Sequence, residues 1–388
     1  MSIKIIGDST MDLSKKVQDE VGIHCVPFSI EFGNDVKKDG SFPNEEMYQY
    51  NATHKDICRS SAVNVGEALK FFEEEGKDGD ELLYFSISSK LSSGFQNASI
   101  AAEEFKNVST FDSQSASLGI ALQALKAKEM AEEGKSMKEI LEVMEQYRHS
   151  TNVSLIVDDL TFMARGGRIS KAAAIGAGLL KFHPILTVKD GSFSVLKKLM
   201  GKIQKLGAKY VDSILEGYEE IDYSLALVGY TSERDSTVDD IVNELKAKGF
   251  KKVVETKTNS TNAVHSGPNT YGVAYICSMK PGKYRFFLGQ LSDQLNEKAA
   301  QKAIEKELIK YMKKDLNPRY KGKTIGKTYI NEYNRKLAEL MNQKVSDIRA
   351  PSGQAVKFIA KRGEVGVHMA LATEGYDRSI VKNGVWGS

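Results

Sequence analysis

Apolar runs and helix-period stretches alternate through residues 1–280. Short apolar runs at 3–6, 81–87 and 223–230 have the length and composition of buried strands, and stretches such as 66–75 carry apolar residues at helical spacing. Up to about residue 150, strands that alternate with helices predict a mostly parallel sheet with covering helices, and a second α/β unit with hairpin-like pieces follows. We therefore expect an α/β fold over this part of the chain.

Two consecutive helices are marked by the residues at their ends. Helical spacing runs from about Leu118 to Glu133 and stops at Gly134. Ser136 then begins a helix at 137–149, and Glu139 lies three residues further on, which is the pattern of a capping box. These signals place two helices just before the next strand-like run.

The pattern divides the chain into three expected domains. We expect an α/β N-terminal lobe at 1–150 and a smaller second α/β lobe at 151–280, which includes a helix at 200–217. An α+β extension follows at 281–388, and Asn317-Pro318 is expected to end its first helix. The expected helices and hairpin strands of the extension lie at 291–316, 329–345, 355–361 and 365–372.

Composition excludes several classes of protein. Hydrophobic residues make up 41% of the chain and charged residues 27%, as in soluble globular proteins. Cys25, Cys58 and Cys277 lie far apart without metal-ligand spacing, which fits a reducing cytoplasm. The longest apolar run, 172–180, is too short to span a bilayer, and the N-terminus does not resemble a signal peptide. We expect a cytoplasmic protein with no metal, no cofactor and no stable membrane insertion.

The net charge of +3 is unevenly spread. It amounts to about −7 over residues 1–280 and about +10 over 281–388. The total is too small to imply a nucleic-acid partner, so none is expected. For the basic extension, a solvated face is the simplest interpretation, and nucleic acid, an anionic membrane or the acidic part of the same chain stay open as alternatives. A chain that stops at 386–388 is also consistent with truncation inside a further domain.

A basic glycine turn lies near the middle of the chain. Arg165-Gly166-Gly167-Arg168 follows an apolar run at 153–157 and precedes the small, apolar stretch at 172–180. Adjacent glycines allow positive φ angles and close approach of the backbone, while arginines supply fixed positive charge. An anion-binding turn that leads into an apolar wall indicates a site for an amphiphilic acid. A loop with solvated arginines before an ordinary buried helix is the alternative.

This turn belongs to a longer run that resembles a known family. The sequence DDLTFMARGGRIS at Asp158–Ser170 is similar to the pattern D-D-L-x-x-L-x-R-G-G-R-I-S of the DegV family, bacterial lipid-binding proteins that carry a fatty acid for a separate fatty acid kinase. The resemblance covers about residues 3–278. It implies a two-lobed DegV-like (EDD) fold, with a mostly parallel sheet in the N-terminal lobe and a smaller α/β second lobe.

Three further motifs carry the resemblance and imply the head-group residues. The turn at 88–98 resembles S-S-x-L-S-G-T-Y-Q-S-A, whose third serine, Ser92 here, holds the acyl carboxylate, although Ser93-Gly94 replaces the family's Gly-Thr. Ser60 takes a threonine position of the family, and His265 lies in a match to G-x-H-T-G-P-G. The implied ligand-binding residues are Ser60, Ser61, Ser92, Ser93, Arg168, His265 and Ser266.

The chemistry of these residue types agrees with an anion site. Hydroxyls and backbone N–H groups at a strand-to-helix turn can cradle an anion with the help of the helix dipole. An imidazole such as that of His265 can donate a hydrogen bond to a carboxylate. Helix capping is the alternative role for Ser60 and Ser61, because serine is a favoured N-cap residue.

The resemblance implies a carrier without catalysis, and hence not an enzyme. A long-chain fatty acid would lie in an apolar tunnel between the two lobes, with 172–180 as part of the wall. Its carboxylate would be presented to a partner fatty acid kinase, and the acyl phosphate would enter phospholipid synthesis. Met200 replaces the family's arginine implicated in meeting the kinase, and neighbouring lysines do not reproduce the guanidinium fork.

Two enzymatic alternatives stay open. A serine hydrolase would use Ser92 or Ser93 as its nucleophile and His265 as its base. Asp8 or Asp112 would orient the imidazole, but the chain has no G-x-S-x-G elbow. A kinase-like subunit resembling dihydroxyacetone kinases would need a nucleotide site, and the chain has no Walker-type glycine loop.

Overall fold

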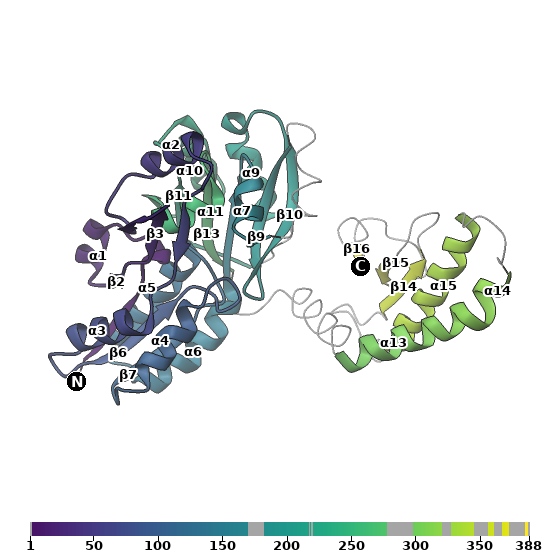
Figure 1. Cartoon of the computed structure of the whole chain (residues 1–388), viewed down its shortest axis with the longest axis horizontal. Coiled ribbons are helices and arrows are strands. Elements are labelled where there is room, and N and C mark those ends of the chain that lie inside the picture. The colour runs from purple at the N-terminus through teal and green to yellow at the C-terminus, as the bar shows by residue number, and fades with distance from the viewer. Residues whose placement is uncertain are drawn as a thin grey trace. The chain divides into compact units, whose positions relative to one another are not determined.

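The computed structural model consists of two compact units, residues 1–280 and 281–388, both drawn in Figure 1. The division of the first unit into lobes at residue 150 stays a prediction. The stretch at 172–180, expected to form a tunnel wall, lies outside the described residues. The structure describes residues 2–169, 182–216, 218, 220–277, 298–319, 327–344, 356–360, 367–371 and 385–386.

A four-stranded parallel sheet forms the framework of the first part of the chain. Its strands are β1 (Ile3–Asp8), β2 (His24–Val26), β6 (Glu81–Ser86) and β7 (Val108–Asp112). They pair in the order β2-β1-β6-β7, each pair in parallel, which confirms the expected mostly parallel sheet. Leu82, Leu83, Tyr84 and Phe85 are fully buried, because a parallel strand covered on both faces needs apolar side chains on both.

A second, six-stranded sheet is mostly antiparallel. Its strands are β8 (Thr151–Ile156), β9 (Phe182–Lys189), β10 (Ser192–Met200), β11 (Ile221–Tyr230), β12 (Lys252–Lys257) and β13 (Tyr271–Cys277). They pair in the order β10-β9-β8-β13-β11-β12, and the β11–β12 pair is parallel. Leu227 packs in the core of the first sheet, whereas Ala226 and Val228 pack on the opposite face. That face is covered by α9 (Gly207–Leu215) and α10 (Ser236–Ala247).

Helix α5 (Leu118–Glu132) connects the two sheets. It packs on β1 of the first sheet and on β8, β11 and β13 of the second. Side chains around its whole circumference are buried, including Leu118, Ile120 and Gln123, as a helix enclosed on all sides requires. The other helices of this part are α1 (Lys15–Val21), α3 (Val65–Glu75), α4 (Gly94–Ala102) and α6 (Met137–Ser150), and α6 has the expected Ser136–Glu139 capping box.

A small three-stranded sheet brings distant segments of the first unit together. Its strands are β3 (Ser29–Phe32), β4 (Asp35–Lys38) and β5 (Arg59–Ser61), and β3 pairs with both others. It shares a core with α2 (Asn44–Thr53) and α11 (Ser260–Ser266), in which Ile30, Met47 and Val264 are buried. Helix α11 also packs on α7 (Thr161–Arg165) and on the 3₁₀ turn η1 (Ser9–Met11).

The helix expected at 200–217 is wrong at its start. Strand β10 continues to Met200, which pairs with Phe182 of β9, and α9 begins only at Gly207. Only Met200 of the expected segment belongs to the hairpin with β9, and the 3₁₀ turn η2 (Ile203–Lys205) lies between it and α9.

The second unit combines helices with a small sheet. Helix α13 packs on α15, and α15 packs on the hairpin strands β14 and β15, which confirms the expected hairpin. The expected helix end at Asn317-Pro318 is wrong, because the chain stays helical through η3 and α14 as far as Arg319. No helix in the described ranges is long and apolar enough to cross a membrane. The elements are α13 (Lys298–Tyr311), the π-helical turn η3 (Met312–Leu316), α14 (Asn317–Arg319), α15 (Lys327–Lys344), β14 (Val356–Ala360), β15 (Val367–Leu371) and β16 (Val385–Trp386).

Candidate functional site

An apolar cavity lies within the first unit, and the space of about 800 Å³ between its lining residues includes a part open to solvent. Its walls come from the turn after β6, the start of α5, strands β8, β10, β11 and β13, and helix α11. The surface that faces the cavity is mostly apolar, as is typical of a small-molecule site, although about half of the lining residues are polar. The apolar side chains that line it are Phe28, Ile87, Leu91, Ala116, Leu118, Val153, Leu155, Met163 and Phe193.

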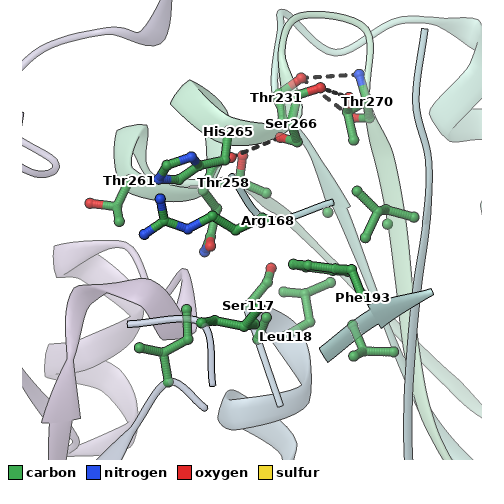
Figure 2. A pocket seen from close by; sticks show the side chains of 18 of the residues that line it. Ser117, Leu118, Arg168, Phe193, Thr231, Thr258, Thr261, His265, Ser266 and Thr270 are labelled. Atoms are coloured by element: carbon green, nitrogen blue, oxygen red, sulfur yellow. Dashed lines mark hydrogen bonds between the residues drawn. The ribbon is translucent and has the colours of Figure 1, made fainter. Parts of the chain in front are cut away.

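Ser60, Arg168 and His265 form a polar cluster at this cavity, called here the head-group cluster. The Ser60 Oγ lies 2.7 Å from Nε2 of His265. Burial, and then the positive charge of Arg168, lower the pKa of His265 from 6.5 to about 3. The imidazole is therefore neutral near pH 7 and carries a single ring N–H to donate. Figure 2 shows the Arg168 side chain beside His265.

The glycine turn explains why these groups can meet. Gly166 lies against His265, and a Cβ at Gly166 would overlap Nδ1 of the imidazole. Gly167 has a φ of +73°, which favours glycine. The turn thereby carries Arg168 to the imidazole.

Arg168 is a half-buried cation without a counter-charge among the described residues. Its side chain donates a hydrogen bond to the Gly166 carbonyl, and burial lowers the pKa of its guanidinium. Among the described residues no carboxylate forms an ion pair with it. Because a half-buried charge without a counter-charge is costly, the cluster favours an anionic ligand.

The other expected serines divide between the cavity and its surroundings. Ser92 lines the cavity, and its Oγ accepts a hydrogen bond from the Gly94 N–H at 3.2 Å. Ser266 also lines it, and its hydroxyl donates to the Asn262 carbonyl at 2.9 Å. Ser61 donates instead to Glu31, and Ser93 is exposed at the start of α4, so neither belongs to the lining.

Several polar residues of the lining were not anticipated from the sequence. Thr231 follows β11 and Thr258 follows β12, and polar residues at the carboxyl ends of strands are a signal that could have found them. Figure 2 shows Thr231, Ser266 and Thr270 together; the Thr270 hydroxyl donates to the Ser266 carbonyl at 2.9 Å. The remaining members of this polar set are Ser117, Ser154, Thr261 and Asn262.

A second pocket also contains the head-group cluster, and its space of about 830 Å³ includes a part open to solvent. Arg59 and Arg165, both exposed, line it together with Arg168. Ser60, Arg168 and His265 line both spaces, so they lie where an apolar cavity meets an arginine-rich pocket. A ligand with an apolar tail and an anionic head fits this combination.

The geometry does not favour a serine hydrolase. His265 is hydrogen-bonded to Ser60, and within the described part of the chain no hydrogen bond joins it to Ser92. Asp8 accepts hydrogen bonds from Ser86, Ile87 and Thr10, so it does not orient the imidazole. The described residues also contain no group of three or more His, Cys, Asp or Glu that could hold a metal ion.

Comparisons with known proteins relate the first unit of the chain to one family. A family model described as an uncharacterised protein of the DegV family matches residues 2–278. A DegV domain-containing protein of Clostridium acetobutylicum is 29% identical over 281 residues, which cover 71% of this chain and 98% of the relative. A fatty-acid-binding DegV family protein of Thermus thermophilus is 30% identical, with a TM-score of 0.64 over 71% of this chain and 100% of that one. DegV of Bacillus subtilis, a fatty acid binding protein, is 25% identical, with a TM-score of 0.61 over 72% of this chain and 100% of that one.

Proposed function

Because this chain belongs to the DegV family, we propose that it binds a long-chain fatty acid and that it does so without catalysis of its own. The acyl tail lies in the apolar cavity, and the head-group cluster holds the carboxylate. The observation that carries this proposal is the half-buried Arg168, a cation without an ion-pair partner among the described residues, at one end of an apolar cavity. Fatty-acid binding by the proteins of Thermus thermophilus and Bacillus subtilis supports the choice of ligand.

The free energies of burial and association indicate separate roles for the acyl tail and the carboxylate head group. Burial of a methylene contributes about 0.8 kcal/mol, so an acyl chain of roughly fifteen methylenes gains about 12 kcal/mol before costs. Association and ordering cost several kcal/mol of that gain. The tail therefore supplies most of the affinity, and Ser60, Ser92, Arg168 and His265 select an acid over a neutral head group.

The arginine-rich pocket gives a partner access to the carboxylate. A fatty acid kinase transfers a phosphoryl group, and Arg59 and Arg165 supply positive charge on the outer side of the cluster. Met200, which is 68% exposed, stands where the family resemblance implies an arginine that meets the kinase, so we propose that docking to a kinase uses other contacts. We propose a cytoplasmic carrier that delivers fatty acids to phospholipid synthesis.

Native mass spectrometry of the purified full chain tests the proposal. We expect a co-purifying mass that matches a fatty acid, and displacement of a fluorescent fatty acid by unlabelled acid. Arg168→Ala should weaken acid binding about tenfold, because it removes the charge nearest the carboxylate. Arg234→Ala is the matched control, since Arg234 is paired with Asp239 and Glu255 and lines neither pocket. Absence of both the acid mass and displacement would exclude this function.

A further inference from the structure

Helix α11 supplies much of the polar lining but is held by residues outside the cavity. It contributes Thr261, Asn262, His265 and Ser266 to the lining. The N-cap side chain of Asn259 makes no capping hydrogen bond. The unpaired N–H groups that every helix start presents are here satisfied by other parts of the chain.

Two buried carboxyl groups hold the start of this helix. The Asn259 N–H donates to Asp12 Oδ1 at 2.7 Å, and the Thr261 N–H donates to Asp39 Oδ1 at 3.1 Å. The Asn262 side chain donates to Asp12 Oδ2 at 2.8 Å and to the Thr10 carbonyl at 2.7 Å. The position and rotation of α11 are therefore fixed by Thr10 and Asp12, which follow β1, and by Asp39, which follows β4.

Asp12 also contacts a second part of the lining. The hydroxyl of Ser117, at the start of α5, donates to Asp12 Oδ2. Asp12 is completely buried and lies outside the cavity lining. Asp12 thus connects helix α11 with Ser117 at the start of α5, and both line the ligand space.

The two connected residues both have a positive φ, although Asp12 is left-handed helical with a ψ of 31° and Ser117 has a ψ of −132°. Asp12 has a φ of +58° and Ser117 a φ of +53°, a region that residues other than glycine rarely occupy. Such conformations persist where surrounding contacts enforce them, and they concentrate at functional sites. The Asp12–Ser117 hydrogen bond joins these two positions directly.

We propose that Asp12, together with Asp39, is a positioning residue for head-group selection. Asp12 fixes α11 so that His265 contacts the ligand's carboxylate together with Ser60 and Arg168. Asp12 itself contacts neither the ligand space nor His265. This inference rests on the proposed fatty-acid binding. A purely structural role would lower stability and leave the choice of head group unchanged.

The chain offers a matched control in Asp8. Asp8 is also completely buried and lies on the same segment, but it accepts hydrogen bonds from Thr10, Ser86 and Ile87, and the described structure has no bond from it to α11. Asn is the appropriate replacement at residue 12, because it tolerates positive φ and places an amide NH₂ where the carboxylate accepted hydrogen bonds. Asp12 thus bonds to α11 directly, whereas Asp8 reaches α11 only through Thr10, and the two Asn variants compare these connections.

The test compares a long-chain fatty acid with the alcohol of equal length, both as competitors of a fluorescent fatty acid. Wild type should prefer the acid. Asp12→Asn should lower acid affinity about tenfold, leave alcohol affinity within about twofold, and shift the NMR signals of the His265 ring. Asp8→Asn should keep the acid-to-alcohol ratio of wild type. If Asp12→Asn does not fold, Asp39→Asn tests the same connection through Thr261.

The outcomes separate the two proposals. A wild-type chain that binds neither ligand would refute fatty-acid binding and this inference with it. A wild type that prefers the acid, with an unchanged ratio in Asp12→Asn or in its substitute Asp39→Asn, would overturn the positioning role alone. An equal change of the ratio in Asp8→Asn would also overturn it, because the effect would then belong to the buried acids in general.

Discussion

Gly166 and His265 lie in direct contact, and this contact depends on the absence of a side chain. The glycine pair of the turn predicted a close backbone approach, but the approaching group could not be known, because His265 is brought there by α11 from a distant part of the chain. A similar limit applies to Ser60 and Ser61. They are neighbours on β5, where successive side chains point to opposite faces, so only the strand's register decides which one lines the cavity.

Gly166→Ala should weaken acid binding about tenfold, because the added Cβ displaces the imidazole from Ser60. Gly167→Ala is the control. The new Cβ at residue 167 would meet open space and would not contact His265. The positive φ of this residue makes the substitution cost about 1 kcal/mol of stability. Displacement titrations and urea unfolding of both variants separate the two effects. Equal acid affinity in Gly166→Ala and Gly167→Ala would contradict the role given to this contact.

The lowered pKa of His265 predicts a specific pH dependence of stability. The unfolded chain binds a proton near pH 6.5, whereas the folded chain binds it only near pH 3. Between these values the unfolded state holds more protons, so the contribution of His265 to stability is complete above pH 6.5 and is lost as the pH falls toward 3. His265→Asn should therefore lose less stability than wild type over this range, at up to about 1.4 kcal/mol per pH unit. Urea unfolding at a series of pH values measures this difference, and parallel curves for the two proteins would refute it.

At the scale of elements, the sequence predicted the helices and strands whose determinants lie within a few residues of each other. The Ser136–Glu139 capping box and the buried strand at 81–87 were predicted because their determinants lie within a few residues. Helix α11 was not predicted, since its first N–H groups are satisfied by Asp12 and Asp39 rather than by a local cap. Elements that depend on distant partners cannot be identified from a periodic pattern.

Two glycines opposite each other form part of the cavity lining. Gly229 of β11 pairs with Gly272 of β13, and a Cβ at Gly272 would meet only the Ser154 carbonyl, at 3.4 Å. Gly272→Val should therefore fit the sheet but occupy ligand space. We expect the affinity for a long-chain acid to fall at least tenfold while a shorter acid loses less, and displacement by acids of increasing length measures the difference. An equal loss for all lengths would indicate general distortion of the sheet instead.

At the scale of the whole molecule, the binding function and the basic charge fall on different units. The family model ends at residue 278, and the division into compact units follows at residue 280. The residues that line the cavity and the arginine-rich pocket all lie before that point. The charge of about +10 belongs to residues 281–388, whose role the binding function does not require.

A chain that ends after residue 280 should consequently bind a fatty acid with an affinity within about twofold of the full chain. Tail burial supplies most of the affinity, and both the apolar lining and the head-group cluster are complete in the first unit as described. The long-chain acid and the equally long alcohol, titrated against both chains, measure this, and circular dichroism establishes that the shorter chain is folded. A folded short chain that binds acid at least tenfold more weakly would contradict the prediction.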